Sequence, residues 1–239
     1  MYYRKHFVMA DSRREKIRDI TREEIKNTAR LLMAEKGAAG LSIRAIAREM
    51  GMTASALYHY FSNLNGLITA LIEDAFTQLA DTIEASSKNP ELTTSAEQLT
   101  AVANAYREWA LNNPTDFQLI YGNPIPGYSQ PTGITYPPAR RSFIVTARIF
   151  TAAIKSGEID LPNNYRDLPS SLEQSLLDLT QVDGHDMPLP ALYLAAKAWV
   201  KIHGHIMLEL FNLIQPVIAN VDDFFQYELK NFIQSVGLK

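Results

Sequence analysis

The stretch from Leu41 to Leu67, LSIRAIAREMGMTASALYHYFSNLNGL, decides the fold, because its pattern predicts two short helices joined by a tight glycine turn. Ser42 is a typical N-cap residue, and the apolar residues after it recur at spacings of three and four along one side of a helix. These inward residues are Ile43, Ile46, Ala47 and Met50. Gly51 ends the first helix, and Thr53 can cap a second, expected over residues 54–60.

The second predicted helix has a polar and aromatic outward face, made by Ser55, Tyr58 and His59. Such a pair of helices is typical of a helix-turn-helix, in which the second helix enters the major groove of DNA and its first residues contact base edges. We therefore expect Thr53 and Ser55 to contact bases. The alternative is a pair of ordinary helices in an all-α core, with Tyr58 and His59 in solvent.

The segments on either side of this stretch fit the same motif. Residues 21–37, TREEIKNTARLLMAEKG, predict an amphipathic helix that ends at a glycine. Its inward residues are Ile25, Ala29, Leu32 and Met33. Asn63 can cap a long fourth helix. The apolar residues of that helix are Leu67, Ile68, Leu71, Ile72, Ala75, Phe76 and Leu79.

These residues together resemble the DNA-binding domain of the tetracycline-repressor (TetR) family of bacterial regulators. The resemblance rests on Ile25-x-x-x-Ala29-x-x-Leu32, Gly37, Ser42-Ile43-Arg44, Ile46-Ala47, Gly51, Leu57-Tyr58-x-Tyr60-Phe61 and Leu67. A pattern with this many fixed points is specific. It implies that Tyr58 and Tyr60 contact phosphate. It also implies that Thr53, Ala54, Ser55 and His59 approach bases.

One position departs from the family pattern. Family members usually carry a lysine on the operator phosphate at the start of the fourth helix, whereas this chain has Leu64 there, followed by Asn65 in place of an acidic residue. The resemblance therefore implies that one phosphate contact in each subunit is missing or replaced. We expect Asn63 to be the replacement.

Charge is divided unevenly along the chain. The whole chain has 23 basic and 26 acidic residues, whereas residues 1–62 contain 12 Lys and Arg against 7 Asp and Glu. A basic end on an acidic body is typical of a protein that binds DNA at one end only. Arg44 and Arg48 are the candidate phosphate partners, and a solvated helix face is the alternative for Arg48.

The pattern predicts three regions. Residues 1–19 form a basic N-terminal arm that we expect to be disordered. The arm has no apolar run long enough for a signal peptide or a membrane span. The arm can lie in the minor groove, or it can be a solvated tail. Residues 20–66 form the helix-turn-helix domain, and residues 67–239 form a ligand-binding and dimerisation domain.

The expected fold is all-α, with a three-helix DNA-binding domain and a larger helical domain. Beyond the fourth helix, helical patterns cover residues 95–112, 114–121, 138–156, 165–181, 189–213 and 221–236. No alternating strand pattern or hairpin signal interrupts them. Cysteine is absent, which excludes disulfides and suits the reducing cytoplasm of a bacterium.

The last two predicted helices, 189–213 and 221–236, have the character of an interface. The first is apolar on almost every side, so it must be covered on every side. Its own domain can cover one side and a second copy of the chain the other, as half of a four-helix bundle about a two-fold axis. We expect a homodimer, which also suits spaced half-sites on DNA. Burial of both helices within a monomer is the alternative.

The same region suggests a regulatory core. Trp199-Val-Lys-Ile-His203-Gly204 resembles the Trp-x-x-x-His-Gly signature of one TetR subgroup, whose C-terminal domain responds to a ligand. Large side chains on the helices of this region can line a pocket: Tyr106, Trp109, Phe117, Tyr121, Phe143, Phe150, Trp199, His203 and Met207. Ordinary core packing is the alternative for each residue singly.

Enzymes are the rival class. The chain has no glycine-rich phosphate loop, nucleophile elbow or His-Glu-x-x-His helix. His203 and His205 are two positions apart on a helix, which is poor geometry for one metal ion. We therefore expect no enzyme, cofactor or metal. The prediction is a ligand-responsive repressor that binds operator DNA as a homodimer. The alternatives are a DNA-binding protein without an effector and a helical enzyme.

Overall fold

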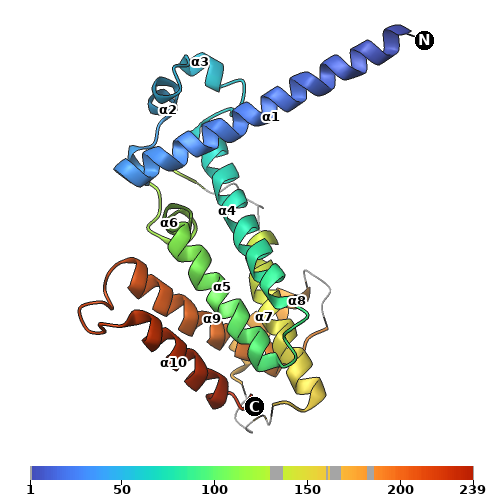
Figure 1. Ribbon diagram of the computed structural model, residues 1–239, viewed down its shortest axis with the longest axis vertical. Coiled ribbons are helices and arrows are strands. Elements are labelled where there is room, and N and C mark those ends of the chain that lie inside the picture. The colour runs from blue at the N-terminus through green and yellow to red at the C-terminus, as the bar shows by residue number, and fades with distance from the viewer. Residues whose placement is uncertain (1, 130–136, 160, 162–167, 182–185, 239) are drawn as a thin grey trace. The chain divides into compact units, whose positions relative to one another are not determined.

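The computed structural model describes residues 2–129, 137–159, 161, 168–181 and 186–238, and Figure 1 shows their arrangement. Within these ranges the chain forms α-helices and one 3-10 turn, η1 (Ala38–Gly40), without a strand, so the all-α prediction is confirmed. The helices are α1 (Tyr2–Lys36), α2 (Ile43–Glu49), α3 (Ala54–Leu57), α4 (Leu64–Ser87), α5 (Ser95–Asn112), α6 (Pro114–Tyr121), α7 (Pro137–Ser156), α8 (Ser170–Gln181), α9 (Leu189–Leu210) and α10 (Val221–Ser235). None of them is both long and apolar enough to cross a membrane.

The chain divides into two compact units. The first contains residues 1–75 and 115–135, and the second contains residues 76–114 and 136–239. The division falls within α4 rather than after residue 66, because the buried face of α4 continues without a break from Leu67 to Leu79. Most of α6 belongs to the first unit, as do the residues that follow it up to 135, whereas the residues before it lie in the second.

The core of the first unit forms where the apolar faces of α1, α2, α3 and α4 meet. Its fully buried members are Ile25, Ala29, Ile46, Leu57, Leu67 and Leu71. Two glycines shape the connections, because Gly37 has a φ of 72° and Gly51 a φ of 65°, a region that other residues rarely adopt. The predicted inward faces of these helices are therefore the ones that pack.

Residues 2–19, expected to be a disordered arm, are the first turns of α1 in the structure. The chain has no glycine or proline between Tyr2 and Lys36, so nothing in the sequence breaks the helix that begins upstream of the packed part. The side chains at positions 13–20 are all exposed, and the first fully buried residue after them is Ile25.

Several helix ends differ from the predicted ones. The helix expected at 54–60 ends at Leu57, because the next residues close into tight turns, with the Tyr60 amide donating to the Leu57 carbonyl at 2.9 Å. Helix α9 ends at Leu210 because Asn212 takes a left-handed φ of 55°. Helix α8 begins at Ser170 rather than 165; residues 165–167 lie outside the described ranges.

In the second unit α7 packs along α9, α5 lies against α7, α9 and α10, and α8 lies against α9. The core between these helices is built mostly from alanine and leucine, with Phe150 among them, and its almost wholly buried members include Leu99, Ala103, Ala147, Phe150, Ala153, Ala191, Leu192, Leu194, Ala195 and Ala198. Alanines on facing helices let the backbones approach closely, so aromatic residues are needed at only a few places.

Candidate nucleic-acid interface and regulatory core

The helix-turn-helix is fixed by its two N-caps. The Ser42 hydroxyl accepts a hydrogen bond from the Ala45 amide at 3.2 Å, and the Thr53 hydroxyl accepts one from the Ala56 amide at 3.2 Å. Each bond satisfies an amide that a helix start would otherwise leave without a partner. Both caps predicted from the sequence are therefore confirmed.

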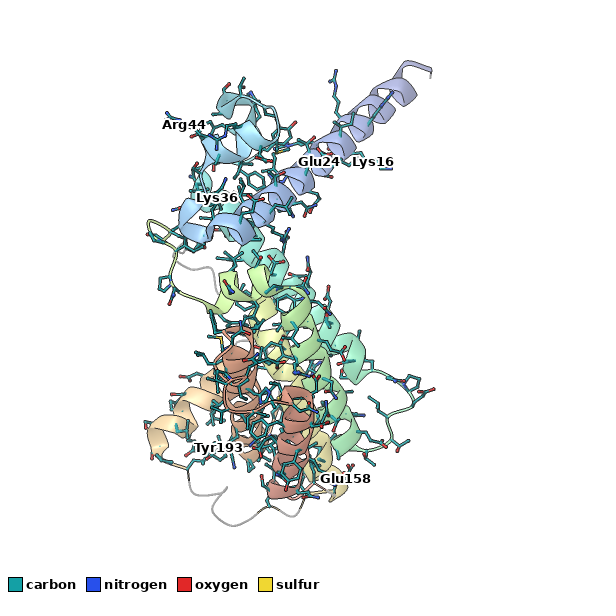
Figure 2. The ribbon with its side chains drawn as sticks, turned by 60° about the vertical axis from the view of Figure 1, so that its left-hand side comes forward. Lys16, Glu24, Lys36, Arg44, Glu158 and Tyr193 are labelled. Carbon is teal, nitrogen blue, oxygen red and sulfur yellow. The ribbon has the colours of Figure 1, made fainter. Side chains whose placement is uncertain are left out.

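The predicted DNA-contacting residues gather on one exposed part of the first unit. Arg44, Thr53, Ser55, Tyr58 and His59 are exposed, whereas Ala54 and Tyr60 are half-buried. Figure 2 shows Arg44 on the outer side of α2, pointing into solvent. The five exposed side chains are therefore accessible to another molecule.

Two of the predicted base-contacting side chains are paired with each other. The Thr53 and Ser55 hydroxyl oxygens lie 3.0 Å apart, within hydrogen-bond distance. Asn63 also has a structural task, because its side-chain oxygen accepts a hydrogen bond from the Gly66 amide at 2.8 Å and so caps α4. Only the amide N–H groups of Asn63 remain to contact a phosphate.

Arg22 of α1 holds the end of the recognition segment, which we define as residues 53–61. This role was not predicted from the sequence. Its guanidinium donates to the Tyr60 carbonyl and lies over the Phe61 ring, 4.3 Å from the ring centroid. Both contacts are long-range in sequence, so no local pattern indicates them. They fix the position of Tyr60, one of the expected phosphate contacts, relative to α1.

A buried ionic network joins three helices of the first unit. Lys26 of α1 lies 2.5 Å from Asp74 of α4, and Arg30 Nε donates to both carboxylate oxygens of Asp116 in α6 at 3.0 and 3.1 Å. Arg30 Nη2 also lies 3.5 Å from Asp74. Lys26 and Asp116 are only 7% and 5% exposed, so little water reaches these charges. The opposite charges of the network stabilise them instead.

The residues predicted to line a pocket do not all share one unit. Phe117 and Tyr121 lie on α6 in the first unit, with ring centroids 5.2 Å apart. The other predicted residues lie in the second unit: Tyr106, Trp109, Phe143, Phe150, Trp199, His203 and Met207. Among these, Phe150 is a fully buried core residue, whereas Phe143 and Met207 are half-buried.

Three of the predicted pocket residues form one stack in the second unit. The Tyr106 hydroxyl and His203 Nδ1 are 2.7 Å apart, and the His203 ring stacks on Trp199 with centroids 5.2 Å apart. Burial lowers the pKa of His203 below its usual range, which favours the neutral ring. Nearby in sequence, Trp109 is buried, and its indole N–H has no partner among the described residues.

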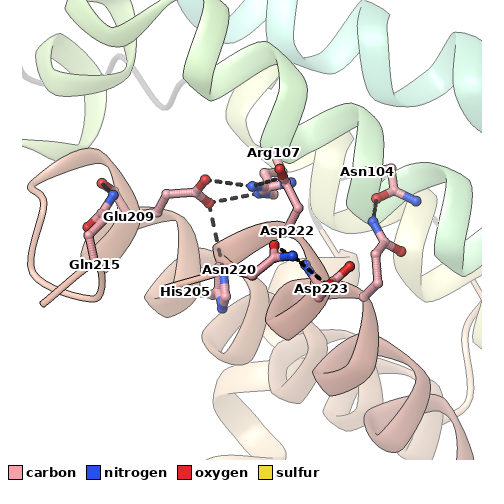
Figure 3. Close-up of polar contacts among 9 residues, drawn as sticks. Asn104, Arg107, His205, Glu209, Gln215, Asn220, Asp222 and Asp223 are labelled. Carbon is pink, nitrogen blue, oxygen red and sulfur yellow. Dashed lines mark hydrogen bonds and ion pairs between the residues drawn. The ribbon is translucent and has the colours of Figure 1, made fainter. Parts of the chain in front are cut away.

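Figure 3 shows a second ionic cluster, in the second unit. Arg107 of α5 donates to both carboxylate oxygens of Glu209 in α9 at 2.6 and 2.7 Å, and to Asp222 of α10 at 2.6 Å. His205 Nε2 lies 3.7 Å from the same Glu209 carboxylate. Burial lowers the pKa of His205, and the Glu209 charge opposes this shift. No local pattern indicates this cluster, because its members come from three separate helices.

A groove of about 260 Å³ runs between α9 and α10 beside this cluster. Its walls are mostly apolar and include Ile202, Leu208, Phe224, Phe225 and Phe232, with the Lys201–Glu228 ion pair at the edge. Exposed apolar side chains are also frequent on α9, on the loop after it and on α10. They are Trp199, Val200, Leu208, Phe211, Leu213, Val217 and Tyr227, and Leu208 also lines the groove.

Both parts of the chain match family models. Residues 25–71 match the model described as bacterial regulatory proteins of the tetR family, and residues 99–232 match the model of the tetracyclin repressor-like C-terminal domain. The HTH-type transcriptional regulator Rv1816 of Mycobacterium tuberculosis is 33% identical over 200 residues, which is 83% of this chain and 84% of the relative. The regulator YttP of Bacillus subtilis is 28% identical over 79 residues, 33% of this chain and 38% of the relative.

Solved structures share the fold. The crystal structure of the regulatory protein SCO4313 has a TM-score of 0.72 and 32% identity, covering 92% of this chain and 98% of that one. The structure of the regulator FadR of Bacillus subtilis, in complex with stearoyl-CoA, has a TM-score of 0.61 and 15% identity, covering 90% of this chain and 98% of that one. The family models and the curated relatives describe transcriptional regulators and not enzymes.

Proposed function

We propose, since this chain belongs to the TetR family of bacterial transcriptional regulators, that it is a repressor which binds a near-palindromic operator as a homodimer and is released by a small molecule. The observation that carries the proposal is the exposed face of the α3 segment, where Thr53, Ser55, Tyr58 and His59 have no packing role. The major groove receives such a face in a helix-turn-helix. A regulator of this kind would act in the bacterial cytoplasm.

We assign roles at the DNA from exposure and chemistry. Thr53, Ala54 and Ser55 approach base edges at the start of α3, and His59 does so in the turn after it. Tyr58, Tyr60 and Arg44 contact phosphates. Asn63 adds a phosphate contact through its amide group, since its oxygen caps α4. Because Leu64 is uncharged, Arg44 and the tyrosines carry more of the backbone contact.

Charge and hydroxyl variants test this docking. An operator is first selected from random duplexes, and binding is then followed by fluorescence anisotropy at several salt concentrations. Arg44→Ala is expected to weaken all sequences alike and to lower the salt slope by about one for each phosphate that the arginine neutralises. Ser55→Ala is expected to relax preference at one base position, by about 1–3 kcal/mol. Equal weakening of every sequence by Ser55→Ala would contradict base contact.

The partner in the dimer is a second copy, packed on α9 and α10. Support comes from the exposed apolar surface, in which Val200 is 63% and Leu208 45% exposed. Gly204 lies in the middle of α9, and a Cβ built there would meet no atom within 4 Å. A glycine weakens a helix, and the described residues do not require a glycine at this position. Close approach of a partner helix would require one.

Two matched substitutions test the dimer. Leu208→Gln and Gly204→Leu are expected to shift sedimentation toward the monomer at micromolar concentration. Leu111→Gln is the control, because Leu111 is similarly exposed, at 37%, but lies on α5. A chain that sediments as a monomer before any substitution would contradict the proposed interface, as would equal effects of Leu208→Gln and Leu111→Gln.

A small molecule in the second unit is the proposed signal. The Tyr106–His203–Trp199 stack offers polar atoms beside aromatic faces, and the buried Trp109 N–H is a donor that a ligand acceptor can satisfy. The complex of FadR with stearoyl-CoA supports a small-molecule effector for a protein of this fold. The alternative is a regulator without an effector. It would be supported if no metabolite changed the affinity of the protein for its operator.

The ionic network around Arg30 is the proposed link between effector and DNA. Helix α6 follows α5 directly, and its Asp116 binds Arg30 of α1, the helix on which α2 packs. A ligand that favours a different position of α6 would act on α1 through this pair, by its differential affinity for two states. Asp116→Asn is expected to keep operator binding and to reduce its response to the effector.

A further inference from the structure

Residues 13–20 form turns of α1 that have no buried side chain. Every side chain from Arg13 to Ile20 is exposed, and the segment RREKIRDI contains four basic and two acidic residues. A helix without an apolar contact face gains no stability from packing. Its exposed surface is therefore available to a partner.

Three arginines of this segment form a row that starts at the recognition segment. Arg14, Arg18 and Arg22 are four residues apart, so their side chains follow one another along one side of α1. Arg22 is anchored at the end of that segment by the Tyr60 carbonyl and the Phe61 ring. The row therefore begins beside Tyr60, which we assigned to a phosphate, and runs away from it along α1.

Each arginine of the row has an acidic residue three positions before it, and pairs at this spacing offset the repulsion between like charges four residues apart. Residues 13–22 still contain five basic and two acidic residues, a net charge of +3, which favours an anionic partner. Arg14 and Arg22 are eight residues apart, about 12 Å along a helix, and successive phosphates of one DNA strand advance by about 3.4 Å along the DNA axis.

We infer that residues 13–22 of α1 form a second DNA-binding element, which contacts the phosphates flanking each half-site. This inference rests on the proposed DNA docking of α3. The element would extend the contacted DNA by about three to four base pairs beyond the phosphate at Tyr60. It reads no bases, because long flexible arginines on a helix outside the groove position the protein and carry no sequence preference.

Duplex length tests the element separately from the helix-turn-helix. The selected operator is prepared with flanks of about two and about eight base pairs on each side, lengths chosen from the phosphate spacing. The double variant R14A/R18A is expected to bind the long duplex about tenfold more weakly, with a salt slope lower by about one for each phosphate that is no longer neutralised. On the short duplex it is expected to bind like the unsubstituted chain.

Two further variants make the result specific. R14K/R18K keeps the charge and is expected to restore both affinity and salt slope. Lys36→Ala removes an exposed cation at the opposite end of α1, as Figure 2 shows, and is expected to change neither duplex. Loss of helix is checked by circular dichroism of each variant.

The outcomes separate the two proposals. If R14A/R18A leaves binding and salt slope on the long duplex unchanged, the second element does not exist, even when the short duplex binds well. If no duplex is selected at all, the docking of α3 fails as well. Binding of the chain to vesicles of anionic phospholipid, abolished in R14A/R18A while DNA binding is kept, would assign the row to a membrane surface and overturn the inference.

Discussion

The two units each contain an ionic cluster, but the clusters are built differently. In the first unit two cations of α1, Lys26 and Arg30, share Asp74 of α4, and Arg30 also binds Asp116 of α6. In the second unit one cation, Arg107, holds two carboxylates on α9 and α10, with His205 beside them. The first cluster contains no histidine, whereas the second includes His205. We therefore expect a pH dependence of stability to arise in the second unit, through its histidines.

The largest expected effect is on the second cluster. Arg107→Ala leaves the Glu209 carboxylate, whose side chain is 10% exposed, without its bidentate partner. Breaking a buried pair in this way costs about 3–5 kcal/mol of unfolding free energy, measured by urea denaturation. The control is Lys201→Ala, which removes the more exposed pair with Glu228 and should cost less than about 1 kcal/mol. Similar losses from both variants would mean that Arg107 is not the key cation of the second unit.

A smaller effect is expected in the first cluster. Asp116→Asn keeps the shape of the side chain but removes the charge that receives Arg30, with an expected loss of about 2 kcal/mol. Asp74 lies 3.5 Å from Arg30 and can take over part of its charge. The measurement is again urea denaturation, with Glu24→Gln, an exposed acidic residue of α1, as the control. A loss as large as that of Arg107→Ala would remove the difference between the clusters.

Next in size is the hydrogen bond between Tyr106 and His203. Tyr106→Phe removes the hydroxyl that lies 2.7 Å from His203 Nδ1, at a cost of about 1 kcal/mol. The variant also changes the environment of the His203 ring, so its ring-proton signal in NMR is expected to move. Tyr227→Phe, at an exposed tyrosine of α10, is the control and should leave both measurements unchanged.

The smallest effect is the pH dependence of the second unit. Burial lowers the folded-state pKa of His205 and His203, so the unfolded chain binds more protons below the usual histidine pKa. Stability is therefore full above about pH 6.5 and falls as the pH drops below it, by about 1 kcal/mol or less since both rings are partly solvated. Urea denaturation at several pH values measures the fall. His205→Phe is expected to reduce it, and a stability that rises on acidification would contradict the assignment.

The helix-turn-helix was predictable from the sequence because its determinants are local. Ser42 and Thr53 each cap an amide three residues away, and Gly51 makes its turn with its immediate neighbours. The helical nature of the second unit followed in the same way from the spacing of apolar residues. Local patterns of this kind do not depend on how the helices are finally assembled.

The ionic clusters were not predictable, because their members are far apart in the chain. Arg30 and Asp116 are separated by 86 positions, and Arg107 and Glu209 by 102. Nothing near either arginine indicates its partner. The extent of α1 was mispredicted for a different reason, since a polar sequence without glycine or proline is compatible with both an exposed helix and a coil.

The bond between the Thr53 and Ser55 hydroxyls has a consequence for how the protein chooses a sequence. Before any duplex arrives, each hydroxyl already has a partner in the other, 3.0 Å away. Only one of the two hydroxyl hydrogens is engaged in this bond, so the hydroxyl that accepts it still has its own hydrogen to donate. A base acceptor can receive that hydrogen while the bond between the two hydroxyls is kept. Selectivity at this position should therefore be for a single base that offers one acceptor to the remaining hydroxyl hydrogen.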